Sequence, residues 1–117
     1  MKILTRKQFM KEPEGTLFSY YKPCYFEGLH AKDTGYEKDN PDFSMSDFIG
    51  AVKSDSSNDL FEKCDRMELG ESFPVDFEFS GREGLFDEEL LYAVYDKEDV
   101  RKLIARLQAM LTLQGEK

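Results

Sequence analysis

Two residues carry side chains that could form a nucleophile and its base. His30, the only histidine, lies six residues after Cys24, and a bend between them would allow a thiol–imidazole pair. Neither residue lies in a recognisable nucleophile motif, so a buried cysteine near a surface histidine is the simpler interpretation. The segment 81–84 (GREG) is too short for a phosphate-binding loop and precedes a predicted strand rather than a helix. We therefore predict a non-enzymatic protein that uses no cofactor and no metal.

Carboxylates gather in two places. Those of the first loop could supply oxygen ligands to a divalent cation, but their spacing is not that of an EF-hand. They are Asp33, Glu37, Asp39 and Asp42. We predict a solvated loop, in which Glu37, Asp39 and Asp42 are the candidate residues of an acidic interface. The second group, 87–89 (DEE) beside Arg82 and Glu83, could serve acid–base chemistry but is more simply explained as a charge-balanced turn.

Aromatic residues are concentrated between positions 20 and 36, with a few basic side chains among them. Side chains alternate between the faces of a strand, so some tyrosines must point outward. Outward tyrosines beside basic groups suit a protein interface or a stacked, nucleotide-like ligand, whereas tyrosines with solvated hydroxyls are the structural alternative. The candidate binding residues are Tyr20, Tyr21, Lys22, Tyr25, His30, Tyr36 and Arg82.

The formal charge of −8 is unevenly distributed. Residues 1–11 carry +4 and residues 97–117 carry +2, which leaves −14 on residues 12–96. Such a surface repels nucleic acid and anionic membranes. Acidity can serve solubility alone, but it also predicts a protein partner with a basic surface.

The sequence shows neither a membrane-spanning segment nor a signal peptide, and this predicts its compartment. No apolar run approaches the roughly 20 residues that span a bilayer, and residues 1–7 lack the apolar core of a signal peptide. We therefore expect a cytoplasmic protein. Cys24 and Cys64 are far apart and in no metal-binding spacing, so two buried free thiols are expected, although the sequence leaves a single disulfide open.

The elements that must position these residues follow from periodicity. Residues 73–79 alternate between apolar and acidic, which predicts a half-buried strand, and residues 90–95 read as a returning central strand. Asp96 is a natural N-cap for a helix over 97–113, whose apolar side chains recur at helical spacing. We expect this hairpin and the helix across it to form the core.

Local signals also organise the first two thirds of the chain. Thr5 and Gln8 form a capping-box pattern at the start of a short helix. Strands are expected near 16–21, 24–27 and 43–46, whereas 46–53 is compatible with strand or helix. A second amphipathic helix is predicted over 58–69, with Gly70 just after its end. The fold class predicted is α+β, a single domain (1–117) with a largely antiparallel sheet, two main helices packed on one face and a short N-terminal helix.

Several segments together resemble small uncharacterised proteins encoded by bacteriophages and prophages. The resemblance extends from about Leu4 to Leu107 and is carried by 14–18 (EGTLF), 22–26 (KPCYF), 81–87 (GREGLFD) and 91–94 (LYAV). These motifs are structural, so the resemblance implies no activity, cofactor or catalytic residue. It implies a phage-infected bacterial cytosol and a small protein that interferes with host machinery.

Several function classes are compatible with the sequence. The first is a non-catalytic binding protein that inhibits or modulates a host protein. The second is a protein that sequesters a nucleotide-like ligand, for which Lys22, Lys32 and Arg82 are the available basic residues. Two further classes rank below these: a protein that binds no ligand, and an enzyme. A broad acidic face would favour the first class, and an aromatic cleft lined by basic groups would favour the second. Oligomeric state is left open.

Overall fold

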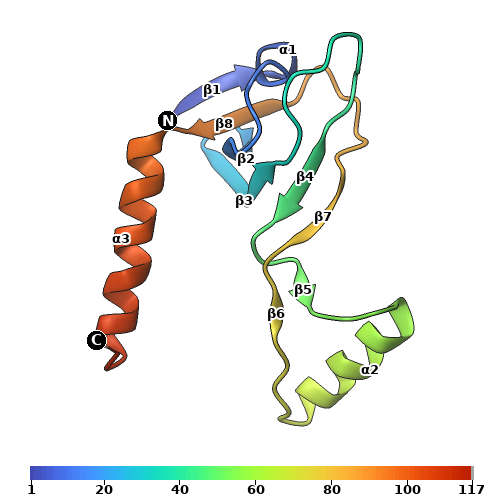
Figure 1. The fold of residues 1–117 in the computed structure, drawn as a ribbon, viewed down its shortest axis with the longest axis vertical. Coiled ribbons are helices and arrows are strands. Elements are labelled where there is room, and N and C mark those ends of the chain that lie inside the picture. Colours follow the sequence, from blue (N-terminus) through green and yellow to red (C-terminus); the bar gives the residue numbers. More distant parts are fainter. Residues whose placement is uncertain (117) are drawn as a thin grey trace.

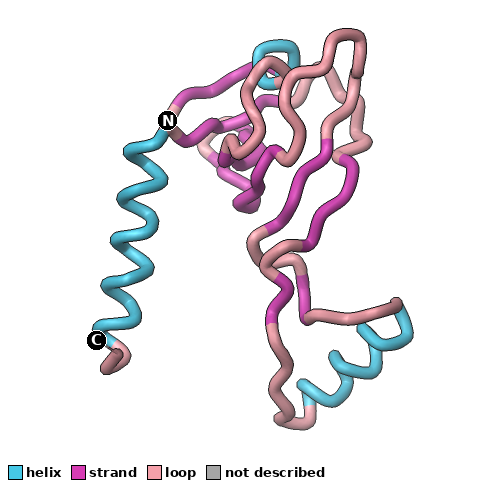
Figure 2. The backbone as a smooth tube through the Cα atoms, viewed as in Figure 1, coloured by secondary structure: helices cyan, strands magenta, loops and turns pink. Residues whose placement is uncertain are grey.

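The computed structural model describes residues 1–116 and contains three helices and eight strands within them (Figures 1 and 2). The helices are α1 (Arg6–Phe9), α2 (Ser57–Glu68) and α3 (Lys97–Leu113). The strands are β1 (Lys2–Thr5), β2 (Leu17–Lys22), β3 (Tyr25–Lys32), β4 (Ser44–Asp47), β5 (Ala51–Val52), β6 (Val75–Asp76), β7 (Phe79–Arg82) and β8 (Leu91–Tyr95). The stretch 46–53, which the sequence left open, contains the end of β4, a turn at 48–49 and β5, and none of it is helical.

Six strands form one antiparallel sheet in the order β1-β8-β2-β3-β4-β7, and β5 and β6 form a separate pair. In the middle of the large sheet, Phe18 lies opposite Val94 on β8 and opposite His30 on β3. The predicted α+β class with a mostly antiparallel sheet is confirmed.

An aromatic cluster forms the core on one face of β2 and β8. Its members are Phe9, Phe18, Phe43, Tyr92 and Val94, each at most 5% exposed. The Phe9 ring of α1 stacks on Tyr92 with centroids 4.3 Å apart, and Phe18 meets Phe9 edge-on at 4.7 Å. The one-turn helix α1 thus covers the centre of the sheet.

The predicted hairpin between residues 73–79 and 90–95 is wrong. The strand β8 pairs with β1 and β2, whereas β7 pairs with β4 and β6 pairs with β5. Alternation predicts a strand but not its neighbour, and β8, apolar on both faces, takes a central position between β1 and β2. The predicted core residues Phe77 and Phe79 are 61% and 54% exposed.

Helix ends are where sequence and structure agree most closely. The capping box of Thr5 and Gln8 is present at α1, a short helix of four residues. Asp96 caps α3, which has the predicted bounds. Gly70 follows α2 with φ of 101°, a left-handed conformation that suits glycine.

The predicted packing of both main helices on one face of the sheet is not observed. Neither α2 nor α3 contains a buried residue, and Figure 1 shows both extending away from the six-stranded sheet. Phe9 from α1 and Phe43 from the loop before β4 fill the apolar face that the helices were expected to cover. The radius of gyration is accordingly 16.8 Å, against about 13 Å for a compact domain of this length.

Candidate functional site

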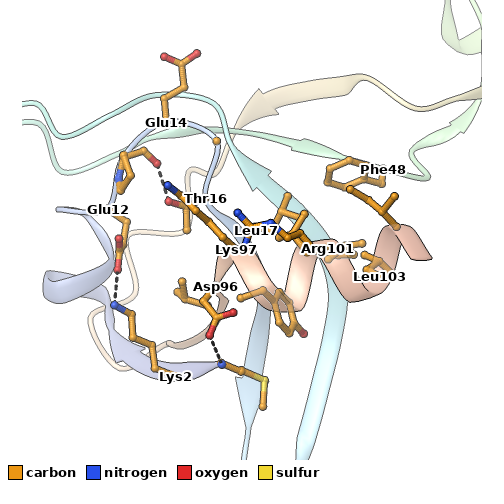
Figure 3. A pocket seen from close by; sticks show the side chains of 18 of the residues that line it. Lys2, Glu12, Glu14, Thr16, Leu17, Phe48, Asp96, Lys97, Arg101 and Leu103 are labelled. Carbon is orange, nitrogen blue, oxygen red and sulfur yellow. Dashed lines mark hydrogen bonds and ion pairs between the residues drawn. The ribbon is translucent and has the colours of Figure 1, made fainter. Parts of the chain in front are cut away.

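An open groove of about 1270 Å³ lies between α3 and the turn that follows β4. Its apolar lining includes residues from the sheet, from α3, from the turn itself and from the segment between β6 and β7. Six of them are Leu17, Phe48, Ile49, Phe77, Ile104 and Leu107. Figure 3 shows Phe48 of the turn, Leu17 of β2, and Arg101 and Leu103 of α3 among the residues that line it. We call this feature the groove.

The first wall of the groove is α3, which is attached to the sheet at its N-terminal end. Asp96 accepts a hydrogen bond from the Asp99 N–H and Asp99 accepts one from the Asp96 N–H. The ammonium group of Met1 lies 2.8 Å from Asp99 Oδ2, which ties the start of the helix to β1. Beyond this first turn the helix has little support, so Ile104 and Leu107 are 61% and 58% exposed.

The opposite wall belongs to residues 48–78, which we call the arm and which contain β5, α2 and β6. Gly50 lies at the base of the arm, where its N–H donates to the Asp76 carbonyl at 3.0 Å. A side chain at Gly50 would meet Phe79, since a Cβ there would lie 2.2 Å from the Phe79 Cβ. The arm presents Ile49 and Phe77 to the groove, and these are 77% and 61% exposed.

The two walls differ in charge. The arm has eight acidic and three basic side chains, a net charge of −5, whereas α3 has four basic and two acidic ones, a net charge of +2. On the arm, Glu62, Asp65 and Glu68 of α2 are exposed to solvent. The arm contributes only apolar residues to the lining itself, namely Phe48, Ile49 and Phe77. The groove is therefore an apolar trough between a helix of net positive charge and a segment whose acidic residues lie outside the lining.

Behind the core, a network of buried polar groups joins α1 to the segment before β8. Arg6 Nη1 lies 2.9 Å from Glu83 Oε1 and donates to the Tyr92 hydroxyl at 2.7 Å, and Arg6 Nη2 donates to the Pro41 carbonyl at 2.9 Å. Tyr20 and Tyr92 both donate to Glu83 Oε2 at 3.3 Å. Burial, followed by the negative charge of Glu83, raises the pKa of each of these tyrosine hydroxyls. Since every buried side-chain polar atom in the described chain has a partner, we interpret this network as structural.

Two other charged residues are buried, contrary to expectation. Lys32, a candidate for ligand binding, is fully buried and donates to the carbonyls of Met10 and Glu12, just after α1, at 3.1 and 2.6 Å. Burial lowers the pKa of its ammonium group, while Glu12 opposes that effect. Lys32 therefore supports the end of α1 and is not available to an outside ligand.

Asp42 was expected in an exposed acidic loop but is 7% exposed. Its Oδ1 accepts from the N–H groups of Phe43 and Gly84, each at 2.9 Å, and its Oδ2 accepts from Arg82 Nε at 2.9 Å. Burial alone would raise the pKa of Asp42, but the two backbone donors and the Arg82 guanidinium outweigh it, so the pKa lies below 3.8. This carboxylate holds β7 to the start of β4 and is not free to meet a partner.

The other two acidic candidates, Glu37 and Asp39, are exposed. Glu37 accepts a hydrogen bond from Asn40 at 2.8 Å, and Asp39 has φ of 65°. Both line a smaller hollow of about 310 Å³ with Tyr36, on the α1 side of the sheet and apart from the groove. Their loop remains a candidate acidic surface.

The tyrosine candidates do not converge on one cleft. Tyr20 lies in the core network, Tyr25 is 58% exposed near the β2–β3 turn, and Tyr36 belongs to the smaller hollow. The Tyr21 hydroxyl accepts from the Cys24 N–H at 3.3 Å in that same turn, and its ring lies 5.4 Å from Phe26. The basic-lined aromatic cleft that a nucleotide-like ligand would need is therefore not formed by these residues.

The remaining reactive or charged candidates are also separated. His30 Nδ1 lies 2.5 Å from Asp47 Oδ1, so it contacts this carboxylate rather than Cys24. Cys24 and Cys64 are both free, but neither is buried as expected, since Cys24 is exposed in the β2–β3 turn and Cys64 is half-buried. Lys22 is exposed and lies 3.9 Å from Glu27. Within residues 1–116, no three His, Cys, Asp or Glu side chains are grouped to hold a metal ion.

The groove was not predicted from the sequence, although part of its lining was recognised as apolar. Val100, Leu103, Ile104 and Leu107 were recognised as an apolar stripe but were assigned to the core. The pair Phe48 and Ile49, between Asp47 and Gly50, is the signal that could have indicated an exposed apolar turn.

Within the described residues, no helix is long and apolar enough to cross a membrane. Comparison with known proteins gives no matching family model, no matching curated protein and no matching solved structure.

Proposed function

We propose that the protein is a non-catalytic binding module that takes a basic amphipathic helix of a protein partner into the groove. The observation that carries this proposal is the apolar trough itself, bordered by an arm of net charge −5. A helix with an apolar stripe at i, i+3, i+4 and i+7 places that stripe in such a trough, and basic residues on its flank face the acidic arm. The partner with a basic surface expected from the sequence fits this arrangement.

The dimensions favour a protein segment over a small ligand. Small-molecule pockets are usually enclosed and occupy about 300–1,000 Å³, whereas the groove is open and larger, at about 1270 Å³. Its exposed apolar side chains, led by Ile49 and Phe77, resemble the anchor residues of an interface before its partner has bound. In the setting proposed from sequence, a bacterial cytosol during phage infection, the partner is a host protein whose activity is inhibited or modulated.

A defined peptide tests the proposal. The probe is a 17-residue helical peptide with leucines in one stripe and Lys or Arg on its flanks, labelled for fluorescence anisotropy. One control peptide has the same residues with the stripe scrambled, and another has Glu in place of each basic residue. We expect only the first peptide to bind strongly, because it alone combines the stripe with a basic flank.

Matched variants locate the binding. Leu107→Asp changes a residue that lines the groove, whereas Leu113→Asp changes a residue of the same helix that is 79% exposed and lies outside it. We expect Leu107→Asp to weaken peptide binding at least tenfold and Leu113→Asp to leave it unchanged. Equal binding of the scrambled peptide, or equal loss in both variants, would refute the proposed function.

A further inference from the structure

The surface area of the chain is larger than a monomer of its mass should expose. The solvent-accessible surface is 8629 Å², whereas a compact monomer of 13.6 kDa exposes about 6,600 Å². The excess is about 2,000 Å² per chain. Permanent homodimers bury 2,000–5,000 Å² in total, or about 1,000–2,500 Å² from each copy, so the excess equals what one copy gives to such an interface.

Part of the exposed surface is apolar and lies on facing walls of the groove. Ile104 and Leu107 on α3, and Ile49 and Phe77 on the arm, are each between 58% and 77% exposed. Several large apolar side chains exposed along one groove mark a surface that a partner covers.

The chain itself supplies a helix with the properties that the groove requires. On α3 the side chains of Val100, Leu103, Ile104, Leu107 and Leu111 recur at helical spacing, a stripe about 17 Å long. The same helix has a net charge of +2, opposite in sign to the −5 of the arm. It is therefore a basic amphipathic helix of the type proposed above as the ligand.

We propose that in solution the groove is filled by α3 of a second copy of this chain. In a two-fold symmetric dimer each contact occurs twice, so α3 of each copy lies against the acidic arm of the other. The two apolar stripes and the exposed residues of both arms are buried together. This inference rests on the proposed function, because it identifies the first occupant of the same groove, and a partner helix would have to displace it.

Sedimentation equilibrium of the full chain between 1 and 100 µM tests this directly. We expect a mass twice that of the 13.6 kDa chain. Leu107→Asp and Ile49→Asp, which alter opposite walls, should each give a monomer with an unchanged circular dichroism spectrum, and Leu113→Asp should remain dimeric. A monomeric parent chain at 100 µM would overturn the inference, as would a dimer that persists in either groove variant. If one groove variant fails to fold, the other decides.

Cross-linking identifies which surfaces meet. A photoreactive benzoylphenylalanine in place of Leu107, in a mixture of ¹⁵N-labelled and unlabelled chains, should give cross-links between copies. We expect these to fall within residues 48–78 or 97–113, and intermolecular cross-links elsewhere alone would overturn the inference.

The basic peptide separates this inference from the proposed function. A monomeric chain that binds the peptide refutes the dimer but leaves the proposed function intact. A dimer that no excess of peptide dissociates, and that binds none of it, confirms the dimer and refutes partner binding in the groove. Dissociation of the dimer by the peptide supports both.

Discussion

Arg6 and Glu83 lie 77 positions apart and form an ion pair of 2.9 Å, with side chains that are 2% and 0% exposed. The pair connects α1 to the segment between β7 and β8, directly beneath the aromatic core. Two charges in this position persist because Tyr20, Tyr92 and backbone groups satisfy the remaining hydrogen bonds.

Removing one partner of this pair should be costly. Arg6→Met leaves the Glu83 carboxylate buried without a counter-charge, so we expect the free energy of unfolding to fall by about 3–5 kcal/mol. Lys22→Met removes an exposed cation 3.9 Å from Glu27 and should cost less than about 1 kcal/mol. Urea unfolding followed by circular dichroism measures both, and a similar small loss in the two variants would show that the buried pair is not structural.

Asp42 should make stability depend on pH in acid. Its pKa is lowered in the folded state, so it contributes stability above about pH 4, near its unfolded pKa, and that contribution is lost as pH falls further through the folded value. Asp42→Asn should be less stable at pH 7 by roughly 1–3 kcal/mol. Its unfolding free energy should also change less between pH 5 and pH 2 than that of the parent. Parallel pH profiles for the two proteins would contradict this assignment.

Tyr20 and Tyr92 should make the stability of the fold depend on pH in alkaline solution. Both pKa values are raised, first by burial and then by Glu83, so the folded state retains protons that the unfolded state releases near pH 10. The stability they contribute is complete below about pH 10 and is lost as pH rises above it. Absorbance at 295 nm should show a late tyrosinate step that coincides with unfolding. Tyr20→Phe and Tyr92→Phe should each reduce its amplitude, and a step that precedes unfolding would argue against burial of these hydroxyls.

Local signals were sufficient to predict the helices. The capping residues Thr5 and Asp96 and the glycine at position 70 mark helix ends in both sequence and structure, because a cap acts on backbone groups within four positions of itself. The apolar stripe of α3 was also recognised. Its partner was not, since periodicity shows that a face needs cover but not what covers it.

Long-range features were not accessible to sequence. The residues 90–95 were recognised as a central strand, yet β8 pairs with β1 and β2 instead of the preceding strand. Arg6 and Lys32 are buried although such residues are almost always exposed. Their burial depends on partners far along the chain, including Glu83 for Arg6 and the carbonyls after α1 for Lys32. The groove was missed for the same reason. Its wall α3 was assigned to the core, but Phe9 and Phe43, which are distant from it in sequence, fill that core instead.

Gly50 should be necessary for the arm to leave the sheet as it does. In Gly50→Ala the new methyl group would lie 2.2 Å from the Phe79 Cβ, so we expect a loss of about 1–3 kcal/mol. Gly81→Ala, on β7, is the matched control, since its Cβ meets no atom within 4 Å. Hydrogen exchange should show the loss as weaker protection of β5 and β6. Two variants of equal stability and protection would mean that the base of the arm adapts freely.

The acidic arm should accelerate the capture of a basic helix. Coulomb attraction acts on long-range encounter and is screened by salt, so association of the basic peptide should be at least about tenfold slower in 0.5 M than in 0.05 M NaCl. Dissociation should change less, because contacts in the apolar groove exclude water. Stopped-flow fluorescence measures both rates.

Charge reversal at two places assigns the effect to one surface. Glu62→Lys/Asp65→Lys reverses two exposed charges on α2, and Glu37→Lys/Asp39→Lys reverses two exposed charges in the loop beside the smaller hollow. Each double variant changes the net charge by the same amount, so a general effect of charge would slow association equally in both. We expect the α2 variant to slow it more, because α2 belongs to the acidic arm, whose residues Phe48, Ile49 and Phe77 line the groove. A larger effect of the loop variant would move the acidic interface to Glu37 and Asp39, and no effect of either would leave the acidity of the chain as a solubility feature.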